Sequence, residues 1–184
     1  MRRILGRLGS ADGAEIAEAA LVLPLVFLFL LGIVWFGRAF NIYSTITQAA
    51  QQGAVTAARP VCATCPQPAC QWNNTNFPCD ATVETAVLNV MAASSLDKGL
   101  IMSNSVSPPF CTAQLMPAGA CSTTTNNITV CRSVLLNPPA GGGAPQQCGT
   151  IVTFQYPFQF YLPFTSLNMQ KVILTAQAQT RMEN

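Results

Sequence analysis

The feature that most constrains this chain is an apolar run near its N-terminus, residues 19–37. The run has 19 residues, none of them charged, and Leu, Val, Phe and Ile dominate it. An α-helix rises about 1.5 Å per residue, so a helix of this length spans roughly the 30 Å hydrocarbon core of a bilayer. Trp35 and Phe36 stand at its far end, where aromatic residues favour the membrane interface. The run predicts a membrane-spanning helix.

The residues on either side of the run predict its orientation and its fate. Arg2, Arg3 and Arg7 precede it, which favours a cytoplasmic N-terminus and an exported C-terminal part. The alternative is a cleaved secretory signal, but the apolar region of such a signal normally spans only about 7–15 residues. The residues that follow, Phe36-Gly37-Arg38-Ala39-Phe40, offer no convincing small-x-small cleavage site. We therefore expect a retained, single-pass anchor.

All the cysteines lie on the C-terminal side of the apolar run. An even number of cysteines confined to the exported side indicates a disulfide framework in an oxidising compartment. The eight disulfide candidates are Cys62, Cys65, Cys70, Cys79, Cys111, Cys121, Cys131 and Cys148. Eight cysteines permit about a hundred different pairings, so the sequence leaves the connectivity open. We expect the first four, which are closely spaced, to staple one loop-rich patch.

The composition argues against catalysis and against nucleic-acid binding. The chain has no histidine, which rules out Ser/His/Asp and Cys/His catalytic sets, and its seven acidic residues form no paired-carboxylate pattern. Without residues 1–13 the chain would carry six basic and six acidic residues, with no basic stripe for nucleic acid. We expect neither an enzyme nor a bound cofactor.

One cysteine pair has the spacing of a redox or zinc site. Cys62 and Cys65 form a C-x-x-C motif, which could carry thiol–disulfide chemistry or contribute to a metal site. No histidine is available as a further ligand, and the surrounding loop lacks the strand-to-helix context of a thioredoxin-type site. A structural disulfide is the favoured interpretation, and no metal is expected.

The chain divides into a basic leader (residues 1–13), a long helix (14–59) and an exported head (60–184). The helix is expected to continue beyond the membrane because residues 41–58 contain no proline and keep apolar residues near helical spacing. Arg59-Pro60 should end it, since proline disfavours the helical conformation of the residue before it. This outer part either packs on its own head or offers a surface to neighbouring helices. The small residues Ala49, Ala50, Gly53 and Ala54 would permit such close approach.

The sequence of the head predicts a small α+β domain with an antiparallel sheet. Residues 81–95 predict a helix, and residues 100–106, 127–135, 150–160 and 171–181 predict strands. A loop is expected at 137–147, which holds three prolines and three glycines. The last two strands should pair antiparallel through a short connection, with one sheet face buried. Pro157 lacks a ladder donor and so predicts an edge position or a bulge.

The N-terminal third resembles the TadE-like family of pilus assembly proteins, minor pilin-like components of tight-adherence (Flp-type) pilus systems. The residues that carry the resemblance are Gly13, Glu18, Ala19-Leu21, Leu23-Pro24, Gly32, Phe36-Gly37-Arg38 and the Ala49-Ala50 and Gly53-Ala54 pairs. The closing strand, with Leu174-Thr175-Ala176 and Arg181-Met182-Glu183, resembles the usual ending of the family. The likeness covers about residues 10–59 and hardly touches the cysteine-rich middle.

Two residues depart from the pattern. Trp35 stands where the family usually has a glutamate, which puts any role of that second acidic residue in doubt here. Ala19 stands where the major Flp pilins have a tyrosine, which favours the minor class of subunit.

The resemblance implies a processing site and an assembly residue. Prepilin-type peptidases, which are membrane aspartyl proteases, cut after a glycine on the cytoplasmic side of such a segment. Cleavage between Gly13 and Ala14 would make Glu18 the fifth residue of the mature chain. The new α-amino group, with a reference pKa of about 7.7–8.0, would be largely cationic at neutral pH. Glu18 could then pair with the N-terminal ammonium of an adjacent subunit, with Pro24 as a second assembly residue.

The alternative for Glu15 and Glu18 is simpler. Both can be early-helix carboxylates that complement the helix dipole, and the sequence does not say whether Glu15 shares any role of Glu18.

The expected function is that of a minor pilin-like structural component of a tight-adherence pilus or a related secretion machinery. Its partners would be the lipid bilayer, other pilin-like subunits, a prepilin peptidase and the pilus assembly machinery. It would sit in the bacterial inner membrane with its head exported. The alternatives are a membrane-anchored periplasmic binding module and a tethered thiol–disulfide protein.

Overall fold

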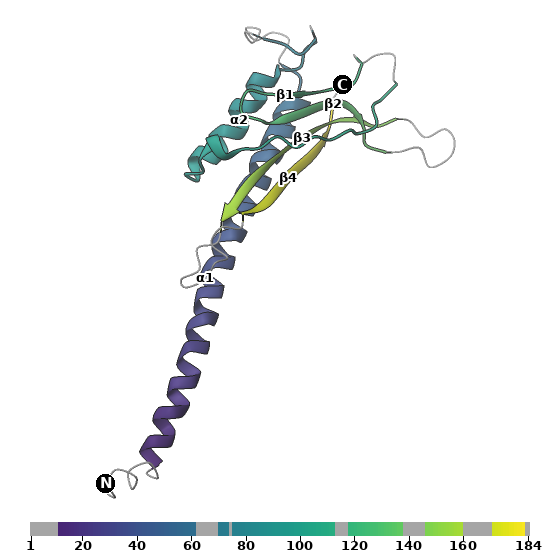
Figure 1. Cartoon of the computed structure of the whole chain (residues 1–184). Helices are drawn as coiled ribbons and strands as arrows, with labels where there is room; N and C mark the ends of the chain where they lie inside the picture. Colours follow the sequence, from purple (N-terminus) through teal and green to yellow (C-terminus); the bar gives the residue numbers. More distant parts are fainter. Residues whose placement is uncertain are drawn as a thin grey trace, which may run out of the picture. The chain divides into compact units, whose positions relative to one another are not determined.

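A computed structural model describes residues 11–61, 70–73, 75–112, 118–137, 146–159 and 171–182, with only the backbone at residues 11–14. The chain forms two compact units, Met1–Phe40 and Asn41–Asn184. One long helix, α1 (Ala11–Ala58), contributes to both units (Figure 1). The predicted fold class, a long N-terminal helix followed by a disulfide-bonded α+β domain, is confirmed.

Helix α1 ends where the sequence predicts and begins at Ala11, three residues before the predicted start at Ala14. It passes Pro24 without a break and ends at Ala58, directly before Arg59-Pro60, as predicted from the restriction that proline imposes. Its most apolar eighteen-residue window has a mean hydropathy of 2.7 and is not buried in the protein. Within the described ranges, α1 is the helix that is long and apolar enough to cross a membrane.

The head is built on a four-stranded antiparallel meander. Its strands are β1 (Ala120–Thr123), β2 (Thr129–Leu135), β3 (Cys148–Gln159) and β4 (Lys171–Arg181), in the spatial order β1-β2-β3-β4 (Figure 1). The last three correspond to predicted strands, with ends that differ by two residues or fewer, and β3 and β4 pair antiparallel as expected. The first strand was not predicted. The connection between β3 and β4 lies outside the described residues.

One face of the sheet is covered by two helices, the outer part of α1 and α2 (Asp80–Ala93). The core between them is fully buried and includes Ala49, Ala50 and Ala54. A Cβ placed on Gly53 would lie 2.6 Å from Val87 Cγ2 and 3.3 Å from Val152 Cγ1. The small residues therefore let α1 approach its own α2 and β3. This supports the first of the two alternatives, and the interpretation of these residues as a surface for neighbouring helices is wrong.

The opposite face of the sheet is also covered over β2 and β3, although it stays exposed on β4, which corrects the prediction of a single buried face. The predicted strand at 100–106 is absent; a 3-10 helix, η2 (Lys98–Leu100), is followed by an extended segment, residues 101–112. This segment makes isolated bridges to β3 through Met102 and to β2 through Phe110. Between these points Val106 packs against Ile151 and its neighbours. The segment crosses the sheet instead of following one edge, so it cannot form a continuous ladder.

Pro157 is accommodated inside β3 because the strand is locally an edge there. The N–H and C=O of Gln155 bond to Met102, at 2.8 Å each. Backbone groups two residues apart in a strand point to the same side, so the missing N–H of Pro157 would also point away from β4. The ladder between β2 and β3 has already ended at Thr153. Pro157 thus costs no hydrogen bond with β4, and the predicted edge position is confirmed in this local sense.

Candidate functional site

The predicted processing residues and Glu18 lie in the first turns of α1, and Pro24 lies further along the same helix. Gly13 and Ala14 belong to the helix, which begins at Ala11, and nothing is described of the Ala14 side chain. Glu15 and Glu18 follow with exposed side chains. Carboxylates near a helix N-terminus are favoured by the helix dipole. Glu18 is therefore open to contact from outside the chain, while its role in assembly stays a prediction.

The apolar part of α1 exposes nearly all of its large side chains. Leu21 is 73% exposed, Phe27 is 55% exposed and Phe36 is 71% exposed. Exposed apolar surface on this scale marks contact with lipid or with other proteins. A shallow apolar depression on this surface is lined by Leu25, Leu28, Phe29, Gly32, Ile33 and Phe36. Gly32 has open space where a Cβ would be, so another helix could approach closely at this point.

Trp35, which replaces the expected glutamate, contacts the arginine that ends the apolar run. The guanidinium carbon of Arg38 lies 5.7 Å from the centroid of the Trp35 ring. The two residues are three apart on one helix face, and an arginine at this distance is attracted by the aromatic quadrupole. A cation–π contact thus stands where the family pattern would allow an ion pair.

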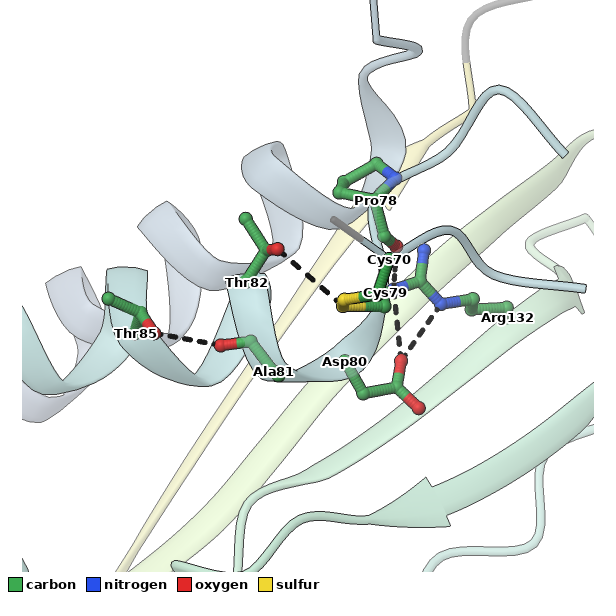
Figure 2. Close-up of a disulfide and its surroundings, with 8 residues drawn as sticks. All are labelled: Cys70, Pro78, Cys79, Asp80, Ala81, Thr82, Thr85 and Arg132. Atoms are coloured by element: carbon green, nitrogen blue, oxygen red, sulfur yellow. Dashed lines mark hydrogen bonds and ion pairs between the residues drawn. A yellow bond between two sulfur atoms is a disulfide. The ribbon is translucent and has the colours of Figure 1, made fainter. Parts of the chain in front are cut away.

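The junction between the helices and the sheet is organised by a buried arginine that the sequence analysis did not single out. Arg132 of β2 is 1% exposed. It donates from Nη1 to the Ala57 carbonyl at 2.9 Å and from Nη2 to the Pro78 carbonyl at 2.8 Å. It also forms an ion pair with Asp80, at 2.9 Å from Nη2 and 3.2 Å from Nε (Figure 2). The Trp72 ring lies 5.3 Å from its guanidinium carbon.

The Arg132 side chain thus joins β2 to three other parts of the head: the end of α1, the loop before α2 and the start of α2. The Ala57 carbonyl is at the end of α1, and Asp80 is the first residue of α2. Asp80 also accepts a hydrogen bond from Ser122 of β1. Burial lowers the pKa of Arg132, and the neighbouring Asp80 carboxylate opposes that shift. The signal that could have revealed this junction is a lone charge inside a strand of otherwise uncharged residues, since a buried charge requires partners.

A second buried charge holds the turn between β1 and β2. Glu84 of α2 is 9% exposed. It accepts hydrogen bonds from the Thr125 hydroxyl at 3.1 Å and from the Asn126 backbone N–H at 3.1 Å, together with the Asn126 side-chain amide. Both buried charges in the described part of the head are therefore engaged in holding its elements together.

Three disulfides reinforce the same regions. Cys70–Cys79 closes the loop before α2, next to the Arg132 junction (Figure 2). Cys111–Cys148 fastens the crossing segment to the start of β3, and Cys121–Cys131 links directly opposed residues of β1 and β2. All six cysteines in the described ranges are paired.

The remaining two candidates, Cys62 and Cys65, lie outside the described residues. The predicted patch of four cysteines is thus supported only for its Cys70–Cys79 pair. No group of three His, Cys, Asp or Glu side chains that could hold a metal ion occurs in the part of the chain that the structure describes.

Within the described ranges, one long, exposed apolar helix precedes a disulfide-bonded head, which indicates a single-pass membrane protein. Residues 13–55 match the family model described as TadE-like protein, which confirms the resemblance of this segment to that family. The match begins at Gly13 and extends into the part of α1 that packs on the head. No curated protein and no solved structure matches the chain.

Proposed function

We propose that this protein is a minor pilin-like structural component of a tight-adherence pilus or a related secretion machinery. It is anchored in the bacterial inner membrane by α1, with its N-terminus cytoplasmic and its head exported. The observation that carries the proposal is the extent of the family match, which starts at Gly13 and includes Glu18 and the whole apolar run. The structural or assembly role fits a chain in which, among the described residues, the buried charges and the cysteines all serve to hold the fold.

In this proposal a prepilin-type peptidase cuts between Gly13 and Ala14. The cut removes the basic leader and creates an amino group on Ala14, which is largely cationic at neutral pH because its reference pKa is about 7.7–8.0. Residues four apart in a helix lie one above the other on the same face. The Ala14 amine and Glu18 therefore form a compact pair of opposite charges at one end of each subunit.

Pairing these charges between subunits gives the filament its register. Glu18 of one subunit binds the Ala14 ammonium of the next, which compensates both charges near hydrocarbon, where an isolated charge is costly. The exposed apolar face of α1, with its shallow depression at Gly32, supplies the helix–helix contact that accompanies this pairing. Pro24 lies inside α1 between these two regions, so it belongs to the same contact surface.

The chain provides a matched control for this assembly role. Glu18→Gln and Glu15→Gln each remove one exposed carboxylate from the first turns of the same helix. Both variants should remain processed and inserted in the membrane. In cells that assemble the pilus, we expect Glu18→Gln to lower the amount of this protein recovered with an affinity-tagged pilin subunit at least tenfold. Glu15→Gln should leave the amount unchanged.

The measurement is the ratio of this protein to the tagged subunit in the detergent-solubilised and sheared-filament fractions. Equal recovery of both variants with the wild-type protein would contradict the pairing and leave Glu18 with the helix-dipole role alone.

A further inference from the structure

The start of β4 breaks the rule of alternation that the rest of the strand follows. From Leu174 onward, core-facing residues are partly or fully buried and the residues between them face solvent. At the start, however, Val172 is 43% exposed and Ile173 is 51% exposed, with Lys171 exposed beside them. Successive residues of a strand point to opposite faces, so both faces of the sheet expose an apolar side chain at this end. A water-facing end of a sheet has no reason to be apolar on both faces.

Contacts within the head show which part of α1 lies beside this end. Ala58 of α1 clusters with Met182, just beyond β4. Further back along the helix, Gly53 lies against Val152, which pairs with Ala178 of β4. α1 and β4 therefore run in the same direction, so that earlier residues of β4 lie level with earlier residues of α1.

The rise per residue of a strand and that of a helix then show which residues of α1 lie level with the start of β4. The six residues from Ala178 back to Val172 cover about 20 Å of strand, at about 3.3 Å per residue. Twelve residues of helix, at about 1.5 Å each, cover about 18 Å. The start of β4 is therefore level with about residues 41–43 of α1, a stretch that includes Tyr43, with allowance for the crossing angle. Tyr43 is itself 47% exposed, and tyrosine is enriched at the membrane–water interface.

The stretch of α1 around Tyr43 is separated from the membrane-spanning run by only a few residues. The uncharged run ends at Gly37 and is followed by Arg38. Tyr43 is the fifth residue after Arg38, which limits the distance between them to about 18 Å for any conformation of the chain. The polar headgroup layer begins where the hydrocarbon ends and is about 5–7 Å deep on each side. The head is thus tethered so closely that this end of the sheet can reach the lipid surface.

We propose that Lys171, Val172 and Ile173, together with Tyr43, form a second membrane contact, through which the head rests on the lipid surface that α1 crosses. The two apolar side chains enter the interface from the two faces of the sheet, and the Lys171 ammonium binds lipid phosphates. The contact is defined by these four residues; in sequence, the connection at residues 160–170 carries no charged residue. The proposal rests on the membrane anchor and does not depend on processing or pilus assembly.

Site-specific photocrosslinking to lipid tests this contact on the full chain. p-Benzoylphenylalanine is introduced at Ile173 or, as the matched control, at Gln177, which is exposed on the same face of β4. A third variant carries it at Phe36 in the anchor as the positive control. The protein is reconstituted in vesicles of phosphatidylethanolamine and phosphatidylglycerol that contain an alkyne-tagged phospholipid, irradiated, and assayed by mass for lipid adducts.

We expect the lipid adduct at position 173 to exceed that at position 177 at least tenfold. Lys171→Gln should lower the yield at 173 about fivefold in these acidic vesicles, since one basic residue near the surface contributes about this much. A yield at 173 no higher than at 177, while Phe36 labels, would overturn the proposal. An adduct of 173 to a second copy of the chain in place of lipid would also overturn it.

Discussion

Replacing Arg132 by methionine should destabilise the head by about 3–5 kcal/mol. Methionine fills much of the same space but cannot donate hydrogen bonds, so the Ala57 and Pro78 carbonyls each lose a donor. A buried polar group left without its partner costs about 1–3 kcal/mol. Asp80 is 26% exposed and keeps its bond from Ser122, so its loss of a partner adds less. The sum matches the range observed when one member of a buried charge pair is removed.

The free energy of unfolding can be measured on the full chain in detergent micelles, with the disulfides oxidised. Urea titration followed by near-ultraviolet circular dichroism reports the packing of the head. Arg181→Met is the matched control because Arg181 is an exposed arginine at the end of β4, and exposed substitutions usually change stability by less than about 0.5 kcal/mol. Asp80→Asn keeps an oxygen acceptor toward Arg132 and should cost only about 1–2 kcal/mol.

The test is the order of the changes in free energy of unfolding for the three variants. We expect Arg132→Met to be the most destabilising, Asp80→Asn intermediate and Arg181→Met close to neutral. If Arg132→Met and Arg181→Met differed by less than about 1 kcal/mol, the junction would not depend on Arg132, and the account of how α1 is held to the head would fail.

Three further predictions concern the same head. Gly53→Val should destabilise it by about 1–3 kcal/mol in urea titration because even a Cβ at this position meets a valine of α2, whereas Gly32→Val, in open space, should have no such effect. Burial raises the pKa of Tyr156, so the associated stability is present below about pH 10 and is lost as the pH rises through the folded-state pKa. Tyr156→Phe should therefore flatten the decrease in unfolding free energy between about pH 9 and about pH 11, and an unchanged decrease would contradict this reasoning. Replacing both Cys111 and Cys148 by serine opens a loop of 37 residues and should cost about 4 kcal/mol, more than opening either short-loop disulfide; a smaller loss than for those would refute the ranking.

The parts of the fold that follow from local rules were predictable. Arg59-Pro60 fixed the end of α1, and the alternation of Val152, Phe154 and Tyr156 identified β3, because proline restriction and strand periodicity act within a few residues. β1 was missed because Ala120–Thr123 is short and carries little strand signal of its own. It forms by pairing with β2 and is linked to it by a disulfide.

The features that depend on distant partners could not be predicted in the same way. Residues 100–106 have the composition of a strand. They cross a face of the sheet instead because Met102 forms a bridge to β3 whereas Phe110 forms a bridge to β2. The small residues around Gly53 would suit either a neighbouring subunit or the chain's own head, since close packing needs the same side chains in both cases. The three acceptors of Arg132 come from residues 57, 78 and 80, and no local pattern connects them.

The N-terminal residues differ again, because their proposed chemistry requires another protein. Family likeness points to Gly13 and Glu18, and the structure adds that the Glu18 side chain is exposed within a helix that begins at Ala11.

The most direct test of the pilin-like assignment is the intact mass and N-terminal sequence of the protein from cells with and without an active prepilin peptidase. The account predicts a chain that starts at Ala14 when the peptidase is active and at Met1 when it is absent. Gly13→Leu should block the cleavage, while Gly9→Leu, a matched change in the same leader, should not. A chain that still starts at Met1 in cells with an active peptidase would contradict the central claim.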